Sequence, residues 1–254
     1  MSDYSNTASA MAASTVAIVT GASRGIGAAI SRRLARDGMD VVVNFSGSKA
    51  AAESLAEEIA GAGGRAVAVQ GDVSDPLAMA RLFDVAEETF GKVGVLVNNA
   101  GIMTLARIQD CPDDMFDSIV AVNLKGTFNG LREAARRLRD GGRIVNLSTT
   151  VIGLRLETYA VYAATKAAVE AMTGILAKEL RGRAITVNAV APGPTATDLF
   201  TQGKPPELIE RMARMAPLER LGTPEDIASV VSFLAGPDGG WVNGQVLRAN
   251  GGLI

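Results

Sequence analysis

Short apolar runs rich in β-branched residues alternate with longer helical patterns along almost the whole of this 254-residue chain. In the first helical pattern, Ile26, Ile30 and Leu34 recur at intervals of four residues and therefore share one helix face. Most of the apolar runs are continuous rather than alternating, which indicates strands buried on both faces of a sheet. Strands are expected at residues 15–20, 41–43, 66–69, 93–97, 144–147, 184–190 and 244–247.

The strand–helix–strand order defines the fold class, because neighbouring parallel strands must be joined by right-handed crossover connections. The sequence therefore predicts an α/β fold with a doubly wound, parallel, seven-stranded sheet flanked by helices. No repeat and no linker rich in Pro, Ser or charge divides the chain, so residues 15–254 are expected to form a single domain. Residues 1–14 are rich in Ser and Ala and are expected to form a flexible N-terminal tail.

Residue types that the sequence lacks exclude several chemistries. There are no histidines, so neither a Ser/His/Asp hydrolase nor a His-ligated metal site can be built, and no metal is predicted. The single Cys111 can form no internal disulfide, which fits a reducing compartment. The 25 basic and 27 acidic residues offer no basic surface for nucleic acid. The sequence shows neither a signal peptide nor the roughly 20 apolar residues that span a bilayer, so a cytoplasmic protein without membrane contact is expected.

A glycine-rich turn, residues 20–27 (T-G-A-S-R-G-I-G), follows the first predicted strand directly and opens the first predicted helix. Glycine permits a tight turn and lets the backbone approach a pyrophosphate, and the N–H groups at a helix N-terminus attract phosphate. Glycine-rich turns also occur in plain connections, but the strand–turn–helix context favours a dinucleotide site. The expected contacts in this turn are Gly21, Ser23, Arg24, Gly25, Ile26 and Gly27.

Further candidate residues follow the third and fourth predicted strands, whose carboxyl ends should border the same crevice. Asp72 and Val73 follow the third strand, and the Asp72 carboxylate is suited to accept a hydrogen bond from an adenine amine. Asn99, Ala100 and Gly101 follow the fourth strand. Each segment alone also fits an ordinary Asx turn, but their joint position at strand ends favours a shared dinucleotide site.

The end of the second strand indicates which dinucleotide is bound. An acid at this place hydrogen-bonds the ribose hydroxyls of NAD. Here the strand ends with Asn44 and Ser46 and carries no acid, Arg24 lies in the glycine-rich turn, and Ser48 and Lys49 follow the strand. Such cations and hydroxyls suit a 2′-phosphate, although the two cations also fit solvated surface charges. The sequence therefore predicts NADP(H) rather than NAD(H), with Asn44 and Ser46 among the cofactor contacts.

Tyr162 and Lys166 lie four residues apart at the start of a strongly helical stretch, so they share one helix face. A free tyrosine has a pKa of about 10, and lowering it by about 3 units takes about 4 kcal/mol. A positive charge about 4 Å away, at an effective dielectric constant of about 20, supplies that energy. Lys166 is therefore suited to activate Tyr162 as an acid–base group, whereas the isolated pattern also fits a core tyrosine and a solvated lysine.

Taken together, these segments resemble the classical short-chain dehydrogenase/reductase family in order and spacing. The matching segments are residues 20–27, residues 98–101, Asn123, residues 162–166 and Pro192-Gly193. The resemblance covers residues 15–254 and implies a single Rossmann-like domain that carries both the dinucleotide and the substrate site. It implies an oxidoreductase that interconverts a carbonyl and a secondary alcohol by hydride transfer with NADP(H).

The resemblance also implies roles for individual residues. Tyr162 is expected to donate or accept the substrate proton, Lys166 to lower its pKa and hold the nicotinamide ribose, and Asn123 to support a water relay to Lys166. Residues 191–197 resemble the family segment that binds the nicotinamide amide and the pyrophosphate, and residues 198–218 are expected to form a substrate lid. The cofactor contacts are completed by Val122, Tyr162, Lys166, Pro192, Gly193, Thr195 and Thr197.

A third hydroxyl is expected to hydrogen-bond the substrate oxygen, and here the sequence departs from the family's serine. Counted from the fifth strand, Thr149 takes this catalytic position, whereas counting back from Gly153 gives Thr150. Ser148 would precede the catalytic position and is a third candidate. A threonine hydroxyl can make the same hydrogen bond as serine, while its methyl group restricts χ1 and narrows the pocket. Thr149 is taken as the catalytic residue on the count from the strand, and Thr150 and Ser148 stay alternatives.

Two other functions share these sequence features. A 3-oxoacyl-thioester (acyl carrier protein) reductase would carry every one of the motifs, and a non-catalytic dinucleotide-sensing regulator would keep the fold. The presence of both Tyr162 and Lys166 favours an enzyme over a sensor. The family usually forms dimers or tetramers through paired long helices, and the Ala-rich residues 163–177 suit such packing. A homo-oligomer, with a homotetramer as the specific expectation, is therefore predicted.

Overall fold

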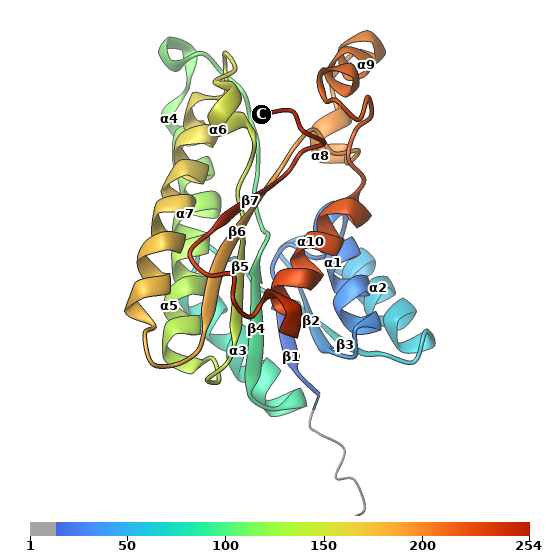
Figure 1. Ribbon diagram of the computed structural model, residues 1–254, viewed down its shortest axis with the longest axis vertical. Coiled ribbons are helices and arrows are strands. Elements are labelled where there is room, and N and C mark those ends of the chain that lie inside the picture. The colour runs from blue at the N-terminus through green and yellow to red at the C-terminus, as the bar shows by residue number, and fades with distance from the viewer. Residues whose placement is uncertain (1–13) are drawn as a thin grey trace, which may run out of the picture.

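The computed structural model describes residues 14–254, which form a seven-stranded sheet in the order β3-β2-β1-β4-β5-β6-β7 (Figure 1). All neighbouring strands are parallel, so the predicted fold class and the seven predicted strands are confirmed. The predicted tail, residues 1–14, lies outside the described residues except for Ser14, whose hydroxyl donates to the Gly38 carbonyl at 2.7 Å. The strands are β1 (Val16–Val19), β2 (Asp40–Phe45), β3 (Arg65–Gln70), β4 (Val93–Asn98), β5 (Arg143–Leu147), β6 (Thr186–Pro192) and β7 (Val246–Ala249).

The strands begin within two residues of the expected positions, and the structure explains two of the differences. β2 begins at Asp40, before the expected start, because its buried carboxylate pairs with Arg65 of β3 (Nε to Oδ1, 2.7 Å). β6 begins at Thr186 rather than at residue 184, because Ala184 has a φ of 51°, which lies in the left-handed region and is incompatible with a strand. Charge pairing and backbone conformation therefore set these two boundaries.

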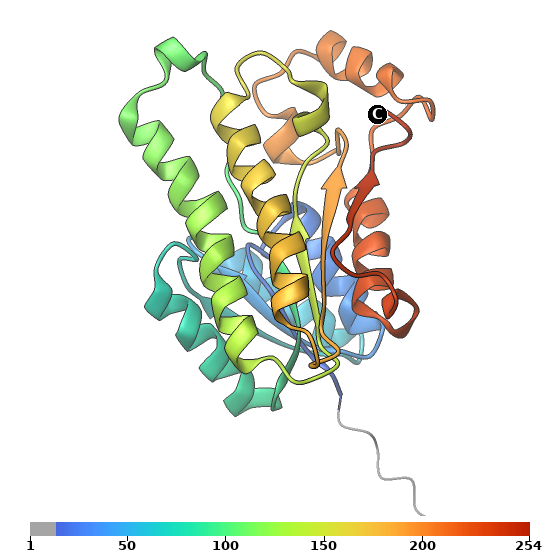
Figure 2. The ribbon, with the colours of Figure 1, turned by 60° about the vertical axis from the view of Figure 1, so that its left-hand side comes forward.

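Helices cover both faces of the sheet, as a parallel sheet requires (Figures 1 and 2). On one face, α1 (Gly25–Arg36), α2 (Lys49–Gly61) and α10 (Pro224–Ala235) pack on a core that includes Ile30 and Leu34, both predicted to face inward. On the other face lie α3 (Pro76–Phe90), α5 (Thr127–Arg137) and α7 (Ala160–Glu179). The π-helical segment η2 (Val120–Gly126) joins α4 (Asp113–Ile119) to α5.

A buried polar network connects the centre of the sheet to α7. The Asn98 side chain on β4 donates to Asn146 Oδ1 on β5 at 2.9 Å, and the Asn146 amide donates to the Thr173 hydroxyl on α7 at 2.9 Å. Thr173 in turn donates to the Val169 carbonyl at 2.8 Å. Because these groups are buried and paired, the network fixes α7, the helix with Tyr162 and Lys166, to the ends of two strands.

The strand order reverses between β1 and β4, and ligands of open α/β sheets bind outside the carboxyl ends of the strands at such a point. Above this edge in Figure 1 lie α6 (Val151–Leu154), α8 (Asp198–Thr201) and α9 (Pro206–Met215). Two 3-10 turns, η1 (Ile108–Asp110) and η3 (Pro237–Gly239), complete the described elements. The carboxyl edge of the sheet is therefore the place where the predicted site residues should meet.

Candidate active site

The glycine-rich turn between β1 and α1 is a place where only glycine fits. Gly21 and Gly25 have φ values of 60° and 54°, in the left-handed region. A Cβ atom on Gly21 would lie 2.8 Å from Cα of Ala100. A Cβ atom on Gly27 would lie 2.5 Å from both Asn99 Nδ2 and the Gly21 carbonyl oxygen. Gly21 and Gly27 therefore allow the turn to pack directly against the residues that follow β4, and Gly25 supplies a second positive φ.

Side chains from neighbouring strands fix the conformation of this turn. Asn99 Nδ2 donates to the carbonyls of Thr20 and Gly21 at 2.9 and 3.0 Å, and the Thr20 hydroxyl accepts from the backbone N–H groups of Asn99 and Ala100, both at 3.0 Å. Asn44 Oδ1 accepts from the Gly21 N–H at 3.2 Å. The turn is thus held by hydrogen bonds before any ligand is bound.

The turn leaves the N-terminus of α1 available to an anion. Arg24 occupies the N-cap position without a side-chain cap, and the first turn of α1 carries no acidic residue. Helix N–H groups without partners favour phosphate groups at this place. The Arg24 side chain is exposed and forms no ion pair with any described residue. Both features fit the phosphates of a dinucleotide.

The side chains of Asn44 and Asp72, both predicted cofactor residues, form hydrogen bonds within the protein. Besides binding Gly21, the Asn44 amide donates to the carbonyls of Val69 and Gly71 at 3.3 and 3.0 Å. Its amide is therefore already occupied, and Asn44 lines the cavity as a support of the turn. Asp72 Oδ1 accepts from the N–H and the hydroxyl of Ser74 at 2.9 and 2.8 Å, which is the Asx-turn alternative. Its second oxygen has no partner among the described residues.

Lys49, which was expected near a 2′-phosphate, does not reach the cavity. Its ammonium group lies 3.7 Å from Glu53 on the same face of α2. Ser46 and Ser48 do line the cavity beside Arg24, so the cationic end of the site has one arginine and two serines among the described residues.

One continuous cavity of about 570 Å³ runs along the carboxyl edge of the sheet. It is lined at one end by the glycine-rich turn and at the other by the first turn of α7. Segments of the lid region, α8 and α9, border it as well. All predicted cofactor residues line it: Gly21, Ser23, Arg24, Gly25, Ile26, Gly27, Asn44, Ser46, Asp72, Val73, Asn99, Ala100, Gly101, Val122, Tyr162, Lys166, Pro192, Gly193, Thr195 and Thr197.

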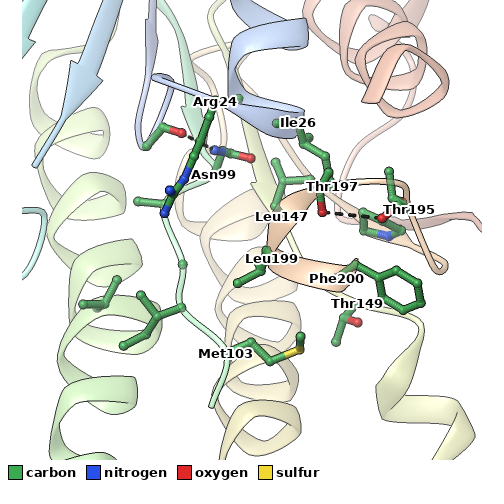
Figure 3. A pocket seen from close by; sticks show the side chains of 18 of the residues that line it. Arg24, Ile26, Asn99, Met103, Leu147, Thr149, Thr195, Thr197, Leu199 and Phe200 are labelled. Carbon is green, nitrogen blue, oxygen red and sulfur yellow. Dashed lines mark hydrogen bonds between the residues drawn. The ribbon is translucent and has the colours of Figure 1, made fainter. Parts of the chain in front are cut away.

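The segment after β6 folds back over the glycine-rich turn. The Gly193 N–H donates to the Ala249 carbonyl at 2.9 Å, and the Thr195 hydroxyl donates to the Gly193 carbonyl at 2.9 Å. Thr197 donates back to the Thr195 carbonyl at 3.4 Å, and a Cβ atom on Gly25 would contact Thr197 Cγ2 at 3.5 Å. Figure 3 shows Thr195 and Thr197 on the side of the cavity where α8 begins.

Lys166 is a buried lysine that has no carboxylate partner among the described residues. It is 4% exposed, and its ammonium group donates to the Leu147 carbonyl at the end of β5 at 2.7 Å. Burial lowers the pKa of Lys166 to about 8. The ammonium group lies 6.0 Å from the centre of the Tyr162 ring. A charge that titrates near neutral pH is therefore held beside the tyrosine.

Tyr162 has a pKa that differs from the sequence-based expectation. Burial raises the pKa of Tyr162 to about 12, and a hydrogen bond with Thr149 offsets part of this rise. The expected lowering by Lys166 is not met in the described structure, because the Lys166 ammonium group binds the Leu147 carbonyl and desolvation of the phenol dominates. In this state the Tyr162 hydroxyl is protonated at neutral pH and can donate a proton.

The structure distinguishes the three candidate hydroxyls near the end of β5. Thr149 Oγ1 accepts from the Val151 N–H at 3.3 Å and lies beside the Tyr162 phenol, whose pKa it lowers. Ser148 instead donates to Glu170 Oε1 at 2.6 Å, and Thr150 donates to the Ala191 carbonyl at 3.1 Å. All three line the cavity, but only Thr149 of these three hydroxyls is beside the tyrosine oxygen.

Asn123 is fully buried and does not line the cavity. Its side chain pairs with the backbone of Ile102, accepting from the N–H at 2.8 Å and donating to the carbonyl at 2.9 Å. Gly101 lies between Asn123 and Lys166, since a Cβ atom there would be 3.4 Å from Asn123 Oδ1 and 3.5 Å from Lys166 Nζ. The π-helical segment η2 thus presents Asn123 to the loop beside Lys166.

Several lining residues near Tyr162 were not predicted as site residues. Of the lid residues, Asp198, Leu199, Phe200 and Met212 line the cavity. Figure 3 shows Met103, Leu199 and Phe200 around the end of the cavity where Thr149 lies. Tyr159 precedes Tyr162 by three positions. This spacing places both tyrosines on one side of a helix, so it could have identified Tyr159 as a site residue from the sequence. The unpredicted residues at this end include Met103, Val151, Leu154, Leu156 and Tyr159.

Comparisons with known proteins agree with this geometry. A family model described as enoyl-(acyl carrier protein) reductase matches residues 21–254. A short-chain type dehydrogenase/reductase of Picea abies is 47% identical over 252 residues, covering 94% of this chain and 92% of that protein. An NADPH-dependent aldehyde reductase-like protein, chloroplastic, of Arabidopsis thaliana is 46% identical, covering 94% of each.

A solved structure shares the fold at a similar level. A short chain dehydrogenase from Burkholderia cenocepacia J2315, in complex with NADP, has a TM-score of 0.89 and 38% identity, covering 94% of this chain and 97% of that chain. The molecule is therefore an oxidoreductase with a dinucleotide-binding fold, as the sheet order and the cavity indicate. The chain belongs to the short-chain dehydrogenase/reductase family.

None of the helices in the described part of the chain is long and apolar enough to cross a membrane. Within residues 14–254, no group of three or more Cys, Asp or Glu side chains is arranged to hold a metal ion.

Proposed function

We propose that this protein is an NADP(H)-dependent oxidoreductase that interconverts a carbonyl and a secondary alcohol, with Tyr162 as the proton donor and acceptor. One observation carries the proposal. Thr149, Tyr162 and Lys166 meet at one end of a cavity whose other end is the glycine-rich turn. A cavity of this kind holds a dinucleotide and a small substrate together, which a hydride transfer requires.

The residues that would hold the dinucleotide extend along the cavity. The N-terminus of α1 and the glycine-rich turn face the phosphates, Asp72 and Val73 the adenine, and residues 192–197 the nicotinamide end. When bound, NADPH supplies a hydride for the carbonyl carbon. Arg24 and Ser46 carry the preference for a 2′-phosphate, because an arginine binds phosphate through charge-assisted hydrogen bonds. The NADPH and NADP named for similar proteins support this preference.

The protein's own groups handle the proton. In carbonyl reduction the Tyr162 hydroxyl donates its proton to the oxygen of the substrate, while Thr149 donates a hydrogen bond that positions the same oxygen. The phenolate that remains is stabilised by the Lys166 ammonium group. The attraction between the ammonium group and the phenolate is stronger in a buried site than in water, so this stabilisation is greatest when the cavity is closed. Asn123 holds the loop at Ile102 and Gly101 beside Lys166, where it supports reprotonation from solvent.

The proposal is tested by turnover. The purified protein is supplied with NADPH or NADH and with a panel of ketones, aldehydes and diketones, and consumption of the reduced cofactor is followed by absorbance. Oxidation of NADPH with at least one carbonyl, at a kcat/KM well above that with NADH, is expected. Tight NADPH binding without turnover on any substrate would instead favour the dinucleotide-sensing regulator.

A 3-oxoacyl-thioester reductase is a second candidate function. The family model that matches residues 21–254 is described in terms of an acyl carrier protein, which favours including an acyl thioester in the panel. An acetoacetyl thioester that is reduced much faster than simple ketones would select this candidate. The proton chemistry of Tyr162, Thr149 and Lys166 is the same in both cases.

We also propose that the chain forms a homotetramer. Ile175 on α7 is 58% exposed, and small exposed residues precede it on the same helix at Ala164, Ala167 and Ala171. A face of small and apolar residues permits close packing of a helix from a second copy. Molar mass by light scattering tests the assembly.

The cytoplasmic location stays a prediction, which fractionation of the source cells would test.

A further inference from the structure

Tyr159 places a second phenol in the cavity, and the proposed proton chemistry does not use it. It occupies the N-cap position of α7, three residues before Tyr162, and its side chain lines the cavity. The residue is 8% exposed, and its hydroxyl has no hydrogen-bond partner among the described residues. That oxygen is not one of the fully enclosed atoms without a partner, so it is open to the cavity, where a ligand can pair with it.

The other hydroxyls near Tyr162 are already paired with groups of the protein. Ser148 is bound to Glu170 and Thr150 to the Ala191 carbonyl. Thr149 accepts from the Val151 N–H at 3.3 Å and lies beside Tyr162, and the proposed function assigns these two hydroxyls to the reacting oxygen. Among the described hydroxyls at this end of the cavity, the Tyr159 hydroxyl is therefore the group still available to a ligand. Burial raises the pKa of Tyr159, so the hydroxyl keeps its proton and can donate it in a hydrogen bond.

Apart from the hydroxyls already named and Lys166, most of the side chains at this end of the cavity are apolar. A substrate with many hydroxyl groups, such as a polyol, would leave them unpaired against these side chains. Asp198 also lines the cavity, but its side chain is exposed to solvent. The apolar lining consists of Met103, Val151, Leu154, Leu156, Leu199 and Phe200.

We infer that Tyr159 is a specificity-determining residue, which donates a hydrogen bond to a second oxygen of the substrate close to the reacting carbonyl. Side chains at i and i+3 of a helix lie about 5–6 Å apart at Cβ, so the two phenols suit two oxygens that are only a few bonds apart. The substrate class is an apolar compound with adjacent oxygens, a 1,2-dicarbonyl or an α-hydroxy ketone. This inference rests on the proposed function, because it assigns the first oxygen to Tyr162 and Thr149.

The test compares two substrates that differ in one oxygen. 1-Phenyl-1,2-propanedione carries the adjacent oxygen, and propiophenone has the same apolar body without it. The wild type and Tyr159→Phe, which loses only the hydroxyl, are assayed with NADPH on both. The ratio of kcat/KM for the dione to that for the monoketone is expected to fall about three- to tenfold in Tyr159→Phe, as for the loss of one neutral hydrogen bond. The change should lie mainly in KM.

A binding measurement keeps the inference separate from catalysis. The dione is titrated into the complex with NADP+, in which no hydride can be transferred, and its Kd should be about three- to tenfold weaker in Tyr159→Phe. An unchanged Kd together with a ratio within twofold of the wild type would overturn the role of Tyr159. Absence of turnover on both substrates with the wild type would contradict the proposed function instead, while the Kd comparison would still decide the role of Tyr159.

Discussion

Gly27 is a position where the structure leaves no room for a side chain. In Gly27→Ala the new Cβ atom would lie 2.5 Å from Asn99 Nδ2 and from the Gly21 carbonyl oxygen, and 2.9 Å from Cα of Ala22. Two of these neighbours are backbone atoms, which cannot rotate away. Asn99 would have to give up its hydrogen bonds to the Thr20 and Gly21 carbonyls.

The expected cost follows from these contacts. Two hydrogen bonds at about 1 kcal/mol each, with about 1–3 kcal/mol for overpacking, give a loss of about 3–5 kcal/mol in the free energy of unfolding. In a domain of this size, about 1 kcal/mol shifts Tm by roughly 2–4 °C, so Tm should fall by about 10 °C. NADPH binding should weaken as well, because the turn that faces the pyrophosphate is displaced.

Gly61→Ala is the matched control. Gly61 ends α2, is exposed, and a Cβ atom there would have no neighbour within 4 Å, so the same substitution should be neutral or slightly stabilising. Thermal unfolding followed by circular dichroism and NADPH fluorescence titration measure the two effects. A Gly27→Ala protein with Tm within about 2 °C of the wild type and unchanged NADPH affinity would refute the packing that we describe for the turn.

Three further predictions concern the cofactor, the positioning of Thr149 and the buried lysine. Arg24→Ala should lower kcat/KM with NADPH about 10- to 100-fold and that with NADH little, since a charge-assisted hydrogen bond is worth about 1.5–3 kcal/mol; an equal loss with both would contradict the role of Arg24. Ser148, next to Thr149, donates a hydrogen bond to Glu170 at 2.6 Å and so helps to position Thr149. Glu170→Ala should therefore lower kcat a few-fold to tenfold without a change in NADPH binding, and Glu170→Gln should restore most of the loss. Loss of cofactor affinity in both variants would argue for general disruption. Burial lowers the pKa of Lys166 to about 8, from its ordinary value of 10.5. Between these two pH values the unfolded chain binds more protons than the folded one, so the free energy of unfolding should rise with pH by about 3 kcal/mol relative to Lys166→Met. Wild-type and Lys166→Met curves from urea denaturation that run parallel over this range would show that Lys166 titrates normally.

The fold and the turn could be predicted because their signals are local. Continuous apolar runs identify buried strands, and the glycines after β1 identify a turn whose backbone has positive φ at Gly21 and Gly25. The order of the strands and the cavity at their carboxyl ends then follow from general rules for parallel sheets. For this reason all twenty expected cofactor residues line a single cavity.

The use of individual side chains was less predictable, because it depends on partners far away in the sequence. Asn44 binds Gly21 and Gly71, and neither contact is visible in the strand's own pattern. The choice among Ser148, Thr149 and Thr150 depends on Glu170, 22 residues from Ser148. The raised pKa of Tyr162 arises from burial, which residue spacing does not report.

The most direct test of the account is the proton transfer assigned to Tyr162. Tyr162→Phe removes the hydroxyl and keeps the ring, and it is measured for NADPH affinity and for kcat/KM on the best carbonyl substrate found. We predict a loss of about 100-fold to 10,000-fold in kcat/KM, as for removal of a general acid, with the NADPH Kd within about threefold of the wild type. Turnover within tenfold of the wild type would contradict the account, because another group would then supply the proton.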